Sequence, residues 1–142
     1  MSQQNIELQR RLTDAFNARD IDAFIAYCDP DIEFHALLST AAGDAIYHGH
    51  DGLRTWHRDL EEAWGGETRL EPEANFDLGE HTLVYAVLHG RGSQSGAVVA
   101  MPNGQVLRWK NGRCVYFKGY VRREDALEDL GISEDALVPI AP

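Results

Sequence analysis

The sequence predicts a single α+β domain in which helices come first and strands follow. Two periodicities carry this prediction. Apolar side chains in the first half recur every three to four residues, as on one face of a helix, whereas in the second half they alternate with polar ones, as in half-buried strands. With 142 residues the chain has the usual size of one domain, and we predict that residues 1–142 form it.

Three amphipathic helices are expected in the first half of the chain. The first covers about residues 4–18. The second begins after Asp20, a favourable N-cap residue, and its apolar stripe extends to Cys28 before Pro30 stops it, because proline cannot continue the helical hydrogen-bond ladder. A third helix is predicted over 51–64, with its first residue as the cap.

The predicted strands are separated by turn signals. Pro72, in the strand predicted over 69–78, indicates an edge position or a bulge. The Asn103-Gly104 pair is a hairpin signal. In one interpretation it splits the strand predicted over 97–110, whereas in the other, which we favour, a single bent strand runs through it. A short helix over about 124–131 is expected to follow the last strand. The strands themselves are expected at about 31–38, 45–49, 69–78, 82–91, 97–110 and 114–121.

The composition limits the partners and the compartment. The formal net charge is −10, from 13 basic and 23 acidic residues, so neither nucleic acid nor an anionic membrane is an expected partner. No apolar run is long enough to cross a bilayer, and the polar N-terminus lacks a signal-peptide pattern, which predicts a cytoplasmic protein. Cys28 and Cys114 have neither metal nor redox spacing, and Cys28 is expected to be a buried thiol on the second helix.

Four strings resemble the SnoaL-like, ketosteroid-isomerase-related branch of the nuclear transport factor 2 superfamily by their order and spacing. They are residues 15–24, 29–35, 47–53 and 109–113. The resemblance implies a conical fold, in which a curved, mostly antiparallel sheet wraps around a long helix and encloses an apolar pocket, with an N-terminal helix pair and a short C-terminal helix. It also implies a small apolar ligand and a homodimer formed through the outer sheet face, but not one particular reaction.

The known catalytic sets of this family do not carry over to this chain. Relative to the ketosteroid isomerases, the tyrosine position falls on Leu12, the base falls on Ala36 (or on His35 if the register slips by one), and the second aspartate falls on Gln105. The acid/base position of the SnoaL-type cyclases falls on Arg122, which stays protonated. The Arg-x-Asp pattern of the related epoxide hydrolases is missing from the fourth predicted strand.

The remaining polar groups near the expected pocket are candidates for a site. His35 is a possible general base, since imidazole titrates near neutral pH, although its parity opposite Phe34 also fits a solvated position on the outer face. Gln105 and Tyr120 are candidate hydrogen-bond donors to a ligand carbonyl. The candidate ligand contacts are Trp56, His57, Trp64 and Tyr85.

Two hypotheses about function follow from these residues. The first is a cofactor-free isomerase, lyase or cyclase that acts on a small apolar, carbonyl-bearing compound by acid–base chemistry. The alternative is a non-catalytic domain that binds a small ligand or a partner. The string from His48 to Asp51 contains metal-ligand residue types but lacks a third and fourth ligand at a suitable spacing, so neither a metal nor another cofactor is expected.

Overall fold

The computed structural model describes residues 2–37, 46–65, 67–91 and 96–140 and confirms the α+β class. Its helices are α1 (Ser2–Asn17), α2 (Ile21–Ala26), α3 (Gly49–Trp64) and α4 (Arg123–Leu130), followed by a 3-10 turn at Glu134–Ala136. Its strands are β1 (Cys28–His35), β2 (Ile46–His48), β3 (Arg69–Leu78), β4 (His81–Arg91), β5 (Val98–Lys110), β6 (Arg113–Tyr120) and β7 (Pro139–Ile140).

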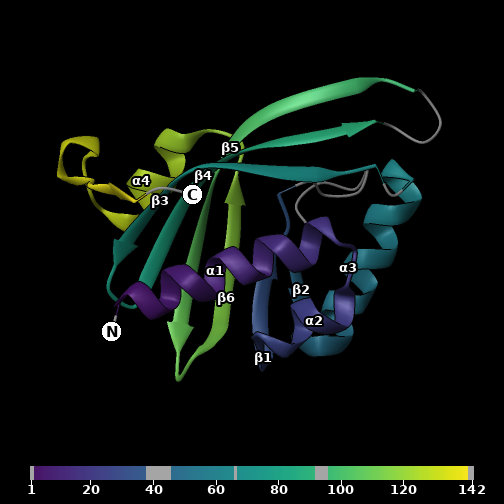
Figure 1. The fold of residues 1–142 in the computed structure, drawn as a ribbon, viewed down its shortest axis with the longest axis horizontal. Coiled ribbons are helices and arrows are strands. Elements are labelled where there is room, and N and C mark those ends of the chain that lie inside the picture. Colours follow the sequence, from purple (N-terminus) through teal and green to yellow (C-terminus); the bar gives the residue numbers. More distant parts are fainter. Residues whose placement is uncertain (1, 38–45, 66, 92–95, 141–142) are drawn as a thin grey trace.

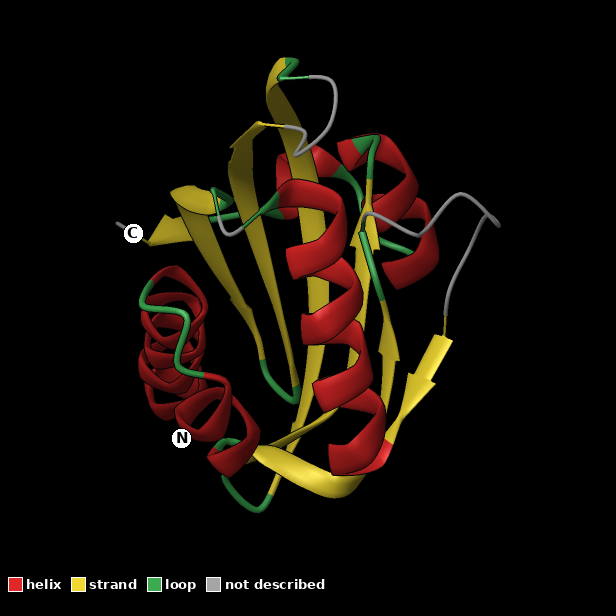
Figure 2. Cartoon of the chain, turned by 90° about the vertical axis from the view of Figure 1, so that its right-hand side faces the viewer, coloured by secondary structure: helices red, strands yellow, loops and turns green. Residues whose placement is uncertain are grey.

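All these strands form one sheet in the order β2-β1-β6-β5-β4-β3-β7. Neighbouring strands are antiparallel except β1 and β6, which run parallel. The sheet is curved and does not close (Figure 2), and α1 crosses one of its faces while α3 and α4 lie at opposite ends of the molecule (Figure 1). The predicted curved, mostly antiparallel sheet around a helix is therefore confirmed.

The two faces of the sheet carry separate apolar clusters, because successive strand residues point to opposite sides. We call the face packed against α1, α2 and α3 the inner face, and the face that carries α4 the outer face. Phe34, Val84 and Leu107 belong to the inner cluster, which is the larger one. Leu83 and Val106, one position away on the same strands, belong to the outer cluster.

The boundary between the second helix and the first strand differs from the prediction. α2 ends at Ala26, and Cys28 is the first residue of β1, so the thiol is buried as expected but in a strand. Pro30 lies inside β1, where the register against β6 shifts, and does not terminate the helix. The apolar stripe predicted the wrong helix end, because the buried position of Cys28 fits the spacing of the helix as well as the start of a strand.

The third helix also begins earlier than predicted. α3 starts at Gly49, so Asp51 lies in its first turn and is not the cap; the N-cap residue is His48, which makes no side-chain capping bond. Gly49 has a φ of 70°, and a Cβ atom there would lie 2.8 Å from the backbone oxygen of Pro30. The close approach of the helix start to β1 therefore requires glycine at this position.

The favoured interpretation of Asn103-Gly104 is confirmed. Both residues lie inside β5, a strand of 13 residues that pairs continuously with β4. A Cβ atom on Gly104 would lie 3.3 Å from Cβ of Ala126, so the glycine gives α4 room to pack on the outer face. Of the two alternatives at Pro72, an edge position or a bulge, the register shift against β4 between Pro72 and Ala74 shows a bulge. Residues 38 and 45, at the ends of two predicted strands, lie outside the described residues.

Candidate functional site

A cavity of about 60 Å³ lies between the inner face of the sheet and the helices. Its walls come from α1, α2, α3 and five strands, so it is assembled from most of the chain. The lining residues are Gln9, Leu12, Thr13, Phe16, Phe24, Phe34, Leu37, Trp56, Leu60, Leu70, Leu88, Gln105, Leu107 and Phe117. The predicted apolar pocket therefore exists in this fold, and apolar side chains form most of its surface.

Aromatic rings form one side of the cavity and are arranged around Trp56. The Trp56 ring lies 4.5 Å from the ring of Phe34, 5.3 Å from that of Phe24 and 6.0 Å from that of Phe16, measured between centroids. Phe34 in turn stacks on Phe117 at 4.4 Å. These distances lie within the range of favourable aromatic contacts, so the packed rings hold this wall in one conformation.

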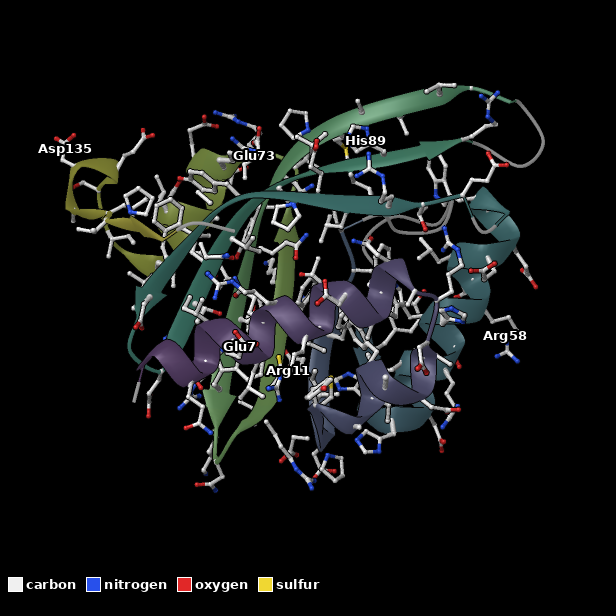
Figure 3. The ribbon with its side chains drawn as sticks, in the orientation of Figure 1. Glu7, Arg11, Arg58, Glu73, His89 and Asp135 are labelled. Atoms are coloured by element: carbon white, nitrogen blue, oxygen red, sulfur yellow. The ribbon has the colours of Figure 1, made fainter. Side chains whose placement is uncertain are left out.

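The described lining residues include no titratable side chain. Their polar members are Gln9, Thr13 and Gln105, all neutral. The charged side chains that Figure 3 labels lie elsewhere, with Arg58 and Asp135 at the periphery of the molecule. Because burial of an unpaired charge is costly, a cavity with this lining favours neutral ligands.

The amide of Gln9 is already engaged in a directional chain of hydrogen bonds. The Trp109 indole, which can only donate, gives its Nε1–H to Thr82 Oγ1 at 2.9 Å. The Thr82 hydroxyl then donates to Gln9 Oε1, and Gln9 Nε2 donates to Asn75 Oδ1 at 2.5 Å. The indole thus sets the direction of the first bond, and the chain ends at Asn75 Nδ2, which is buried without a partner among the described residues.

Gln105 is the other buried amide that faces the cavity. It is 6% exposed, and its Nε2 donates to Asn103 Oδ1 at 3.0 Å. Asn103 itself is fully buried and does not line the cavity, and its Nδ2 donates to the backbone oxygen of Met101 at 3.1 Å. The backbone of Asn103 is also held by α4, since Arg123 Nε donates to its oxygen at 3.1 Å.

His35 does not reach the cavity. It follows Phe34 on β1 and therefore points to the outer face, where its Nε2 lies 2.6 Å from Glu33 Oε2 and its ring lies 5.3 Å from that of Tyr116. The hydrogen bond from His35 lowers the pKa of the Glu33 carboxyl below its usual value. His35 therefore lies on the outer face, as its alternation with Phe34 indicated.

Tyr120 and Tyr85, two more candidate residues, also lie on the outer face. The Tyr120 hydroxyl donates to Asp129 Oδ2 at 2.5 Å, and burial together with this bond raises the pKa of the tyrosine. The Tyr85 ring packs edge-on against Phe76, and the Arg123 guanidinium lies over the Tyr85 ring, 4.6 Å from the centroid of that ring. The expected convergence of His35, Gln105 and Tyr120 is therefore wrong, because only Gln105 is on the inner face.

The candidate contacts on α3 divide in the same way. Trp56 lines the cavity, whereas His57 and Trp64 do not. His57 instead borders a separate void of about 10 Å³ beside α1 and α2, and its buried Nε2 has no hydrogen-bond partner among the described residues. Helical spacing placed these three residues on one broad stripe, but among them only Trp56 borders the cavity, whereas the Trp64 ring lies against Gly90 of β4, where a Cβ atom would come within 3.1 Å of it.

Gln9 and Thr13 are lining residues that the sequence argument missed. Gln9 is 2% exposed and lies on α1 one helical turn before Leu12 and Thr13, all of which border the cavity. Gln9 could have been found because it lies on the inward side of an amphipathic helix. The prediction considered only the apolar residues of that side and did not include Gln9.

The thiols and the remaining polar clusters offer no reactive centre in the part of the chain that the structure covers. Burial raises the pKa of Cys28 to about 12 and that of Cys114 well above its usual value, so both stay protonated. Among the described residues, no group of three or more His, Cys, Asp or Glu could hold a metal, and His50 is bonded to the Cys28 carbonyl at 2.9 Å. The described helices also include none with the length and apolar character needed to cross a membrane.

Comparison with known proteins agrees with this architecture. An NTF2-like protein of unknown function from Burkholderia pseudomallei K96243 shares 24% identity over 88% of this chain and 95% of its own, with a TM-score of 0.76. A putative SnoaL-like polyketide cyclase from Jannaschia sp. CCS1 shares 20% identity, with coverages of 84% and 85% and a TM-score of 0.70.

A third structure, a hypothetical protein with a ketosteroid isomerase-like fold from Catenulispora acidiphila DSM 44928, is in complex with trimethylamine. It shares 17% identity over 91% of this chain and 95% of its own, with a TM-score of 0.71. No curated protein matches the sequence. The SnoaL-like domain family matches residues 9–117, which is most of the chain, and the chain therefore belongs to that family.

Proposed function

We propose that this chain binds a small, neutral, largely apolar molecule in the inner cavity and that Gln105 contacts the polar group of that molecule. The observation that carries the proposal is the lining itself, in which aromatic and aliphatic side chains surround a few neutral polar groups. Ligand sites in proteins commonly have this composition. The ligand class therefore follows from the chemistry of the cavity and not from a relative.

The volume limits the size of the ligand. About 60 Å³ exceeds the roughly 10–15 Å³ that one water needs, but it is well below the 150 Å³ of a dry engineered cavity that holds benzene. A molecule of a few heavy atoms fits without rearrangement. The complex of the Catenulispora acidiphila protein with trimethylamine supports a ligand of that size for this fold, although the two chains share only 17% identity.

Binding without acid–base catalysis agrees better with this geometry than an isomerase, lyase or cyclase reaction does. Proton transfer needs a titratable group within hydrogen-bond reach of the substrate. The described lining residues provide none, and His35 is bonded to Glu33 on the opposite face. A role for His35 as a general base stays a prediction, and substrate turnover that His35→Ala abolishes would support it.

Homodimer formation also stays a prediction. α4 packs on the outer face over β5, as the contact of Ala126 with Gly104 indicates, so only part of that face is available to a second copy. The strip formed by β1 and β6, which includes His35 and Tyr116, remains half-buried in one chain. Sedimentation velocity over a range of concentrations tests this prediction directly.

The binding proposal can be tested by titrating the ¹⁵N-labelled protein with dissolved xenon, a small apolar probe, and following backbone and Trp56 indole signals. We expect saturable shifts confined to residues that line the cavity. Leu88→Phe places extra atoms in the cavity and is expected to abolish the shifts, whereas Leu127→Phe, on α4, makes the same change away from it and is expected to leave them intact. Shifts that persist in folded Leu88→Phe would locate binding elsewhere and refute the proposal.

A further inference from the structure

The Gln105 amide is held in one orientation by a chain that begins at a backbone carbonyl. The Met101 oxygen can only accept, so the Asn103 atom 3.1 Å from it must be the Nδ2 donor. This leaves Asn103 Oδ1 as the atom that faces Gln105, and an oxygen there must receive a donor, which is Gln105 Nε2 at 3.0 Å. The usual ambiguity between amide nitrogen and oxygen is therefore removed by the chain.

The consequence concerns which end of Gln105 faces the cavity. The nitrogen end is bonded to Asn103, a fully buried residue that does not line the cavity, whereas Gln105 itself does line it. The oxygen end, Oε1, is then the end turned toward a ligand. Gln105 was expected to donate a hydrogen bond to a ligand carbonyl, and this arrangement makes it an acceptor.

The other polar groups of the cavity also each have a donor engaged in a hydrogen bond within the protein. The Thr13 hydroxyl donates to the Gln9 backbone oxygen at 3.2 Å. Gln9 Nε2 donates to Asn75, and Gln9 Oε1 already accepts from Thr82. What these groups have left is lone pairs on oxygen and one further N–H on each amide nitrogen, and those nitrogens are directed at Asn75 and Asn103.

We propose that the cavity selects ligands whose polar group donates a hydrogen bond, meaning small neutral alcohols, over carbonyl compounds of the same shape. This inference rests on the proposed binding function. Asn103 acts in it as a positioning residue, since it fixes Gln105 and does not touch the ligand. A ligand hydroxyl completes the bonding of Gln105 Oε1, whereas a ligand carbonyl in its place brings two acceptors together.

The expected selectivity is large enough to measure. A buried polar group left without a partner disfavours binding by an amount that corresponds to roughly 5- to 100-fold in affinity. Because apolar side chains form most of the lining, a water molecule there finds few polar partners and is a poor substitute for the missing one. We therefore expect propan-2-ol to bind about tenfold more tightly than acetone, which has nearly the same shape and also only four heavy atoms.

The test is the ratio of the two dissociation constants, measured by NMR titration of wild type and variants. Gln105→Met removes the acceptor at similar volume and is expected to bring the ratio to within about twofold of one. Gln4→Met makes the same change on an exposed part of α1 and is expected to preserve the wild-type ratio. Asn103→Leu frees the Gln105 amide to turn and is also expected to reduce the ratio, an effect that loss of stability alone does not produce.

The outcomes separate this inference from the function on which it rests. A tenfold preference for the alcohol that disappears in Gln105→Met supports both. Equal or tighter binding of the ketone to wild type overturns the inference while the binding function stands. If neither propan-2-ol, acetone nor xenon shifts signals of cavity residues, the binding function fails and the inference fails with it.

Discussion

Replacing Thr82 by valine breaks the hydrogen-bond chain behind the cavity while it changes the shape of the side chain very little. Thr82 is fully buried on β4, and its hydroxyl has two partners, accepting from Trp109 Nε1 and donating to Gln9 Oε1. Valine can do neither. The substitution therefore leaves one buried donor and one buried acceptor without partners at the same time.

The expected loss of stability follows from these two groups. A buried donor or acceptor that loses its partner costs about 1–3 kcal/mol, and two of them together cost about 2–5 kcal/mol once the small gain from the added methyl group is included. A domain of this size is stable by only about 5–15 kcal/mol. Thr82→Val is thus expected to remove a large fraction of the free energy of unfolding.

Urea unfolding of wild type and Thr82→Val measures this difference, with an unchanged slope showing that the unfolding transition stays comparable. Thr55→Val is the matched control, because both bonds of the Thr55 hydroxyl, to the Asp51 carbonyl one turn earlier in α3 and from Arg58, are exposed, and we expect a change within about 0.5 kcal/mol. A loss below about 1 kcal/mol in Thr82→Val would refute the directional chain. A cycle with Trp109→Phe isolates the indole–hydroxyl bond.

Two other predictions concern the outer face. Because the bond from His35 lowers the pKa of Glu33 from its usual 4.5, the stability that it contributes is present above pH 4.5 and is lost as the pH falls through the folded pKa. The difference in urea stability between wild type and His35→Ala should therefore shrink below pH 4.5, and a constant difference would contradict this. Arg123→Lys loses two bonds to backbone carbonyls and its contact with the Tyr85 ring, so we expect unfolding in urea to show a loss of about 1–2 kcal/mol, against no measurable loss in the exposed Arg122→Lys.

Much of the fold could be predicted because periodicity reports which side of an element is buried. The alternation along residues 69–78 and 82–91 corresponds to β3 and β4, and the helical spacing after residue 50 corresponds to α3. The same parity predicted that His35 and Phe34 point to opposite faces of the sheet, and in the structure they do. Period and parity are properties of the backbone, which is why they survive without any knowledge of the tertiary contacts.

Predictions that depended on tertiary contacts fared less well. Nothing in the local sequence states that Pro30 must lie within β1, because that position is set by the pairing of β1 with β6. The candidate site was predicted poorly for the same reason, since no local pattern indicates that α4 covers Tyr120 and Tyr85 on the outer face. The prediction assumed that polar residues on these strands face the cavity, but Tyr120 and Tyr85 lie on the outer face of the sheet.

The charged side chains of this protein lie away from the described lining of the cavity. The chain carries 23 acidic and 13 basic residues, yet none of them is among the described residues that line the cavity. The inward positions of β5 hold Asn103, Gln105 and Leu107, so the strand that could supply a catalytic carboxylate supplies two neutral amides that bond to each other. An amide pair of this kind fixes the direction of a hydrogen bond without moving a proton. In the function proposed above, this amide pair therefore gives the cavity a means of selecting its ligand.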